Sequence, residues 1–177
     1  SAQGTGKFVL DGSLLRYDIP YDGLSSGLTM AHIHGPSQAG AAAPVLHPLP
    51  VPLGSFSGRL FGSVELTSGQ TTDLQQGRLY VNLHTANFAD GEIRGQILTT
   101  SEPPFEDDDP IISLIPDQRV FMNAAKTIQF AIGDLETPVS QLVLEKNSSN
   151  PSLVPLNRIE FATGAGPHDR TVTITPA

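Results

Sequence analysis

Two short segments of this sequence carry histidines at spacings that suit a metal site. Residues 30–36 read MAHIHGP, and residues 79–84 read LYVNLH. Side chains in a β-strand point alternately to its two faces, so His32 and His34 share one face of the first segment. In the second segment the alternate leucine and valine residues form an apolar row, which leaves His84 on the opposite face. Imidazoles on a face away from the core have no packing role, and a bound metal ion would explain them.

A fourth histidine, His47, lies in the proline-rich segment 35–54, which we expect to be a long loop. Such a loop would fold His47 over the strand that carries the first two histidines. The candidate metal ligands are therefore His32, His34, His47 and His84. A set of nitrogen donors without a thiolate suits copper, zinc or iron, and the affinity order of the first-row metals favours copper. The alternative is that the four histidines are surface residues that bind no ion.

Arg94 lies on the outward face of the strand expected after His84. Its guanidinium is always charged and donates in a planar fork, so it would attract and orient a small anion near the metal. An ordinary surface ion pair with a neighbouring carboxylate is the alternative interpretation. Tyr80 and Asn82 share the face of His84 and are candidates for hydrogen bonds that orient the ligating imidazoles.

Turn residues divide the first hundred residues into short strands that would hold these side chains. Asp11-Gly12 predicts a hairpin between strands at 7–10 and 13–19, because this dipeptide favours tight turns. Further strands are expected at 57–66, 78–85 and 92–98. A turn is expected through Ser68-Gly69. With the histidine strand, these segments predict seven or eight strands that close into a β-sandwich or flattened barrel.

The composition agrees with an all-β protein and narrows the partners. The 177 residues include 17 glycines and 15 prolines, with short apolar runs between them. A formal charge of −8 argues against nucleic acid and anionic membranes as partners, because no basic patch is present to hold phosphates. No apolar run is long enough to cross a membrane. The absence of cysteine removes disulfides and thiolate metal sites from consideration.

The sequence predicts two domains. Residues 1–100 form the β domain with the candidate metal site. Residues 101–110, SEPPFEDDDP, combine prolines with like charges and predict an extended acidic linker. Residues 111–177 predict a small immunoglobulin-like β-sandwich. Its strands are expected at 111–115, 119–121, 127–132, 141–145, 158–161 and 170–175.

The segments AHIHGP and LYVNLHTANFADGEIRGQI resemble the chordin (CHRD) domain, over roughly residues 5–99. This resemblance implies an extracellular β-rich domain, so we expect a secreted or cell-surface protein. The order of HxH, a loop histidine and a distant strand histidine is also similar to the copper ligands of copper-zinc superoxide dismutase, a Greek-key sandwich or barrel. That likeness implies that His32, His34, His47 and His84 bind copper and that Arg94 steers the anion. The zinc ligands and the disulfide of that family are absent here, which implies a single metal.

The second domain resembles the immunoglobulin-like and cadherin-like repeats of large bacterial surface proteins. That resemblance implies a spacer or adhesive repeat, with neighbouring domains in a longer protein. Three functions follow for the whole chain. The first is an extracellular mononuclear copper protein, a superoxide dismutase-like oxidoreductase that acts on superoxide. The second is a metal-binding domain without turnover, and the third is an adhesion or partner-binding module.

Overall fold

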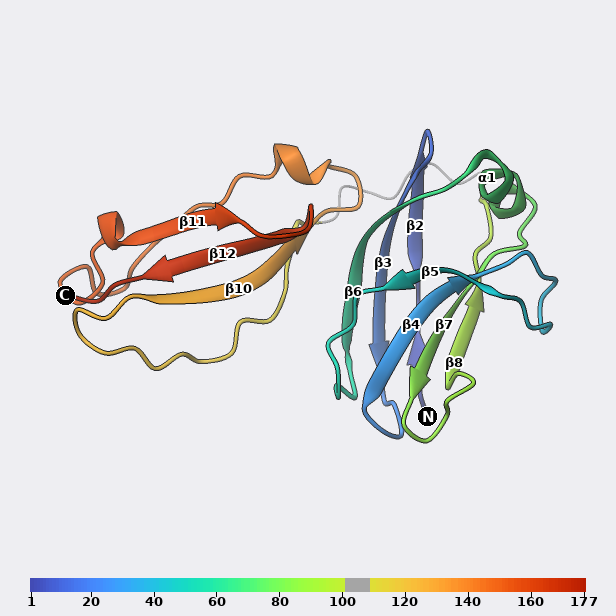
Figure 1. Ribbon diagram of the computed structural model, residues 1–177, viewed down its shortest axis with the longest axis horizontal. Coiled ribbons are helices and arrows are strands. Elements are labelled where there is room, and N and C mark those ends of the chain that lie inside the picture. Colours follow the sequence, from blue (N-terminus) through green and yellow to red (C-terminus); the bar gives the residue numbers. More distant parts are fainter. Residues whose placement is uncertain (101–108) are drawn as a thin grey trace. The chain divides into compact units, whose positions relative to one another are not determined.

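The computed structural model describes residues 1–100 and 109–177, and antiparallel strands dominate both parts (Figure 1). The chain divides into two compact units, Ser1–Glu106 and Asp107–Ala177. The predicted all-β class is confirmed. The predicted acidic linker lies outside the described residues, apart from Asp109 and Pro110.

The first sheet of unit 1 is built around its long strand β3 (Leu14–Asp22). One edge of β3 pairs with β1 (Gln3–Gly4) and β2 (Lys7–Asp11), and the other edge pairs with β6 (Gly58–Glu65). The predicted hairpin at Asp11-Gly12 is confirmed, since β2 and β3 pair on either side of it. Gly12 has φ +62°, a left-handed conformation that glycine adopts without strain.

The second sheet of unit 1 has the strand order β5-β4-β7-β8. Its strands are β4 (Leu28–His34), β5 (Val45–Leu49), β7 (Tyr80–Thr85) and β8 (Ile93–Gln96). The strand β5 lies inside the segment predicted to be a loop, so that prediction is wrong for residues 45–49. Prolines do not exclude a strand at the edge of a sheet, which is where β5 lies.

The core of unit 1 consists of apolar side chains from both sheets, which identifies the unit as a sandwich. It contains Leu15, Tyr17, Ile19 and Leu60 from the first sheet and Ala31, Ile33, Leu49, Val81 and Leu83 from the second. The described strands form no closed barrel. Of the two predicted forms, the sandwich is therefore the one observed.

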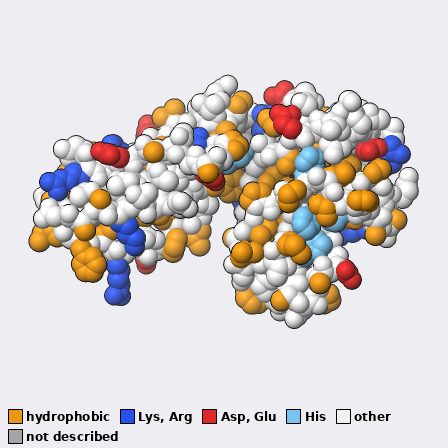
Figure 2. All heavy atoms as spheres, in the orientation of Figure 1, with side chains coloured by type: hydrophobic (Ala, Val, Ile, Leu, Met, Phe, Trp, Pro, Cys, Tyr) orange, Lys and Arg blue, Asp and Glu red, His pale blue; other side chains and the backbone are white. Residues whose placement is uncertain are grey.

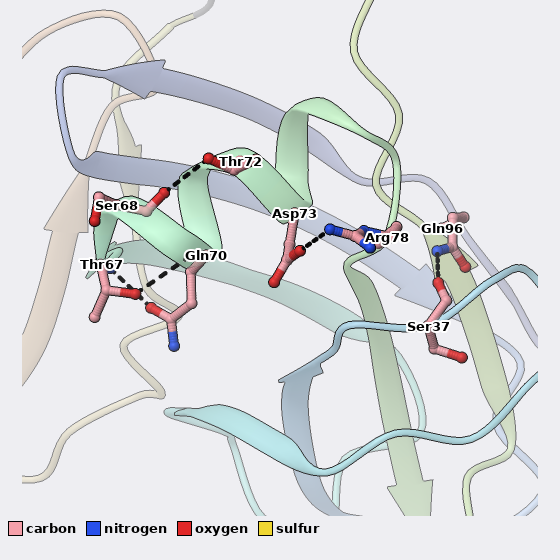
Figure 3. Close-up of polar contacts among 8 residues, drawn as sticks. All are labelled: Ser37, Thr67, Ser68, Gln70, Thr72, Asp73, Arg78 and Gln96. Atoms are coloured by element: carbon pink, nitrogen blue, oxygen red, sulfur yellow. Dashed lines mark hydrogen bonds and ion pairs between the residues drawn. The ribbon is translucent and has the colours of Figure 1, made fainter.

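The helix α1 (Ser68–Gln75) occupies the place where a simple turn was predicted, and that prediction is wrong. Thr67 caps the helix by accepting a hydrogen bond from the Gln70 backbone, and the Gln70 side chain accepts one from the Thr67 backbone (Figure 3). This capping box is the signal in the sequence that indicates the helix. An ion pair between Asp73 and Arg78 connects α1 to the start of β7. None of the helices in the described ranges is long and apolar enough to cross a membrane.

In residues 109–177, unit 2 forms a four-stranded antiparallel sheet of order β11-β12-β10-β9. The strands are β9 (Ile111–Ile112), β10 (Lys126–Gly133), β11 (Ile159–Thr163) and β12 (Asp169–Ile174). Two short 3-10 helices span Val139–Gln141 and Leu156–Arg158. Buried residues of the sheet, with Phe130 and Ile132 among them, form its core.

Two of the strands predicted in unit 2, at 119–121 and 141–145, do not form. The second of these segments shows why the sequence pattern misled. Leu142 and Leu144 pack against the core while Val143 is 84% exposed. A segment that packs alternate side chains has the pattern of a strand whether or not its backbone joins a sheet.

Candidate metal centre

The outer face of the β4–β7 pair carries the polar residues that the sequence singled out. The register places His32 opposite Asn82 and His34 opposite Tyr80, so these four side chains share one face. Residues between them, such as Ile33, fill the core between the sheets. The alternation of apolar and polar residues therefore separates the core from the candidate site, as the sequence predicted.

Three histidines come together on this face, and we call them the histidine triad: His32, His34 and His84. One ligand nitrogen from each lies within 4.8 Å of the other two. Nδ1 of His32 and Nε2 of His84 form a hydrogen bond at 3.0 Å. Nitrogen ligands lie about 2.0–2.1 Å from an ion such as Zn²⁺, so two of its tetrahedral ligands are about 3.3–3.4 Å apart. Figure 2 shows histidine side chains gathered over β4 and β7 with apolar side chains around them.

Two loops fix the orientation of the buried imidazoles. Nδ1 of His34 donates a hydrogen bond to the Ala43 carbonyl at 2.9 Å, and Nδ1 of His84 donates one to the Ala89 carbonyl at 2.8 Å. Because a carbonyl can only accept, each Nδ1 carries a proton, and in the neutral tautomer the lone pair lies on Nε2. Backbone carbonyls orient metal-binding histidines in this way.

The triad is largely closed to solvent but has one accessible member. His34 and His84 are 7% and 6% exposed, and His32 is half-buried. Nε2 of His34 is buried and has no hydrogen-bond partner. A buried nitrogen without a partner costs free energy that a metal–ligand bond would recover. The residues present therefore fit a metal ion.

The electrostatics around His32 favour an uncharged imidazole. Burial lowers the pKa of His32 below its usual 6.5, and the neighbouring His84 and His34 lower this pKa further. A lower pKa means that protons compete less with a metal ion for the His32 lone pair.

The lowered pKa of His32 predicts that acid destabilises the metal-free protein. In the unfolded chain His32 binds a proton near pH 6.5, and in the folded protein it resists that proton. Stability therefore falls as the pH drops below about 6.5 and stops falling below the folded pKa of His32. All three tyrosines lie in unit 1 and the chain has no tryptophan, so tyrosine fluorescence during urea unfolding reports on this unit. We expect the urea midpoint to decrease from pH 7 to pH 5, and to decrease less in His32→Gln. Equal decreases in both proteins would contradict this assignment.

Arg94 stacks on the ring of Tyr80, and Tyr80 stacks on the ring of His34 in the triad. The ring of Tyr80 lies parallel to that of His34, with 4.8 Å between centroids, and the Arg94 guanidinium lies 3.5 Å from the Tyr80 centroid. Tyr80 is buried, and its hydroxyl accepts a hydrogen bond from the Ala43 backbone. Arg94 is exposed and pairs with Asn82 across the strands, so it lies on the same outer face as the triad. The role of Arg94 in steering an anion stays a prediction.

His47 is not part of the triad. It lies in β5 opposite Ile33, a core residue, so its side chain belongs to the other face of the sheet. Its Nε2 lies 3.2 Å from the side-chain oxygen of Gln70 in α1. The structure thus brings together three of the four predicted ligands and separates the fourth.

Sequence reasoning missed the backbone groups that support the triad. The carbonyls of Ala43 and Ala89 leave no trace in the pattern of side chains. The sequence carried a signal for the second loop, the turn residues Asp90-Gly91. Asn82 donates a hydrogen bond to the Asp90 carbonyl. Gly91 has φ +115°, and a Cβ there would come within 2.0 Å of the Asn82 amide, so the Asp-Gly turn packs directly against the site.

Comparisons with known proteins identify the family of unit 1. No curated protein and no solved structure matches the chain. The likeness to superoxide dismutase and the immunoglobulin-like character of unit 2 therefore stay predictions. The profile of the CHRD domain matches residues 1–97, which include the whole triad and more than half of the chain. The chain belongs to the CHRD domain family.

Proposed function

We propose that unit 1 binds one transition-metal ion, with copper preferred, through His32, His34 and His84. The observation that supports this proposal is the convergence of three imidazole nitrogens within 4.8 Å, two of them on rings whose tautomer places the lone pair on Nε2. Neutral imidazoles suit copper, zinc and iron, and among divalent ions the general affinity order favours copper. Tetrahedral nitrogen donors lie about 3.3–3.4 Å apart, so the ligand nitrogens farthest apart close by at most about 1.5 Å around an ion.

The metal content of the purified protein tests this proposal. We expect about one equivalent of copper after incubation with excess Cu(II) and removal of unbound ion, measured by elemental analysis on protein without a histidine tag. The double variant His32→Ala/His34→Ala should lose it. His47→Ala is the matched control, because it removes a histidine outside the triad, and it should retain the metal. A protein that folds but binds no stoichiometric metal would exclude the proposal and leave an adhesive module as the function.

Superoxide dismutation is the second candidate function, and the position of Arg94 favours it. Bound copper would supply a redox couple that accepts one electron and returns it. The chain itself supplies a fixed cation on the face of the triad, since the Arg94 guanidinium rests on Tyr80 and Tyr80 on His34. In a protein with a formal charge of −8, a local cation would attract a small anion to this face. A dismutase assay that compares the copper-loaded parent protein with copper-loaded Arg94→Gln tests this. We expect the rate of dismutation to be lower in the variant and to depend less on the salt concentration.

The remaining parts of the proposal concern location and the second unit. Membership of the CHRD family supports an extracellular or cell-surface location.

Unit 2 would act as a spacer or adhesive repeat beside further domains of a surface protein. Its described surface exposes large apolar side chains such as Leu114 at 91% and Phe121 at 82%, which is consistent with contacts to neighbouring domains.

A further inference from the structure

We infer that Met30 supplies a fourth ligand, a thioether sulfur, to the ion held by the histidine triad, and that it favours the cuprous state. This inference rests on the proposed function, because it names a residue that would tune the same site. Residues 30, 32 and 34 alternate along β4 as Met, His and His. The three side chains therefore share one face of the strand.

A β-bulge places Met30 beside His84. The register between β4 and β7 shifts after Leu28: Leu28 pairs with Thr85, and Met30 pairs with His84. An unshifted ladder would have paired Met30 with Leu83, a core residue, because antiparallel partners share a face. The extra residue is Thr29, whose hydroxyl donates a hydrogen bond to the His84 carbonyl at 3.1 Å. Bulges of this kind commonly re-aim side chains next to functional sites.

Core packing does not account for Met30. Its side chain is 46% exposed, although its neighbours Leu28 and Ala31 are 0% and 1% exposed and belong to the core. Met30 thus places an apolar, flexible side chain on the sheet face that carries His32 and His84. Methionine has three rotatable side-chain bonds and a polarizable sulfur, so it adapts readily to a nearby partner.

The chemistry of the thioether identifies the ion and its oxidation state. Soft sulfur ligands select Cu(I), whereas the usual protein ligands of Zn²⁺ are thiolates, imidazoles and carboxylates. The fourth ligand predicted from the sequence, His47, lies on the other face of the sheet, so the triad has no fourth histidine among the described residues. Met30 would supply the fourth ligand, and its thioether would stabilise copper as Cu(I).

Methionine methyl NMR tests this inference directly, because the chain contains only two methionines. The second, Met122, lies in unit 2, is 70% exposed, and serves as an internal control. In protein labelled with [methyl-¹³C]methionine, we expect one equivalent of Ag(I), a diamagnetic substitute for Cu(I), to shift the Met30 signal and leave Met122 unchanged. The Met30 signal is assigned by its loss in Met30→Leu, and its shift should disappear in His32→Ala/His34→Ala.

Affinity measurements separate this inference from the proposed function. We expect Met30→Leu to weaken Cu(I) binding at least about tenfold in competition with a chelator, since the loss of a group that only supports a ligand already costs about that much, and to leave Zn(II) affinity unchanged. If Ag(I) and Cu(I) shift the histidine ring signals but neither the Met30 methyl nor the affinity responds, Met30 is not a ligand and the proposed function stands. If neither ion binds the triad, both conclusions are overturned.

Discussion

Replacing His84 with alanine is expected to lower the affinity of the protein for copper at least about 100-fold, more than the loss of an outer hydrogen-bond partner costs. His84 supplies one of three nitrogens, and its ring connects the β4 histidines to the 86–91 loop through the Ala89 carbonyl. Titration with Cu(II), followed by the visible d–d absorption, measures the loss. His168→Ala is the matched control, since it removes a histidine of unit 2 and should bind copper like the parent protein.

The same variant distinguishes the functions. If the copper-loaded protein dismutes superoxide, His84→Ala should lose that activity together with the d–d band, and far-ultraviolet circular dichroism should show that the sheets remain folded. Copper bound without activity in the parent protein would select the metal-binding domain without turnover. An undiminished copper affinity in His84→Ala would contradict the assignment of the triad.

Replacing Ile33 with alanine is expected to destabilise unit 1 by about 2–5 kcal/mol, the range for large-to-small changes in a packed core. Ile33 is 0% exposed and lies between His32 and His34 in β4, on the opposite face. Its packing between the two sheets therefore holds the strand that carries two of the three histidines. Urea unfolding followed by tyrosine fluorescence measures the change in the free energy of unfolding.

Two further variants show whether this effect comes from burial. Ile33→Val removes one methyl group and should cost only about 0.5–1.5 kcal/mol. Met30→Ala lies on the exposed face of the same strand, so in the metal-free protein it should cost less than about 1 kcal/mol, as is usual away from the core. A similar loss in Met30→Ala and Ile33→Ala would contradict the assignment of the two faces.

The sequence alone predicted those features that depend on neighbouring residues. The two-residue period of MAHIHGP and LYVNLH placed His32, His34 and His84 away from the core, because strand geometry alternates side chains whatever the partner strand is. Asp11-Gly12 predicted its hairpin for a similarly local reason. The capping box at Thr67 and Gln70 was an equally local signal for α1, and it was overlooked.

Only the tertiary structure decided which of these residues meet. Packing of the two sheets sets the register of β4 against β7, which lie about fifty residues apart in the chain, and a bulge after Leu28 shifts it. The same packing placed His47 in an edge strand on the opposite face, which no local pattern reveals. The carbonyls of Ala43 and Ala89 orient the imidazoles through the backbone. Because every residue carries the same carbonyl group, only its position in the fold gives it this role.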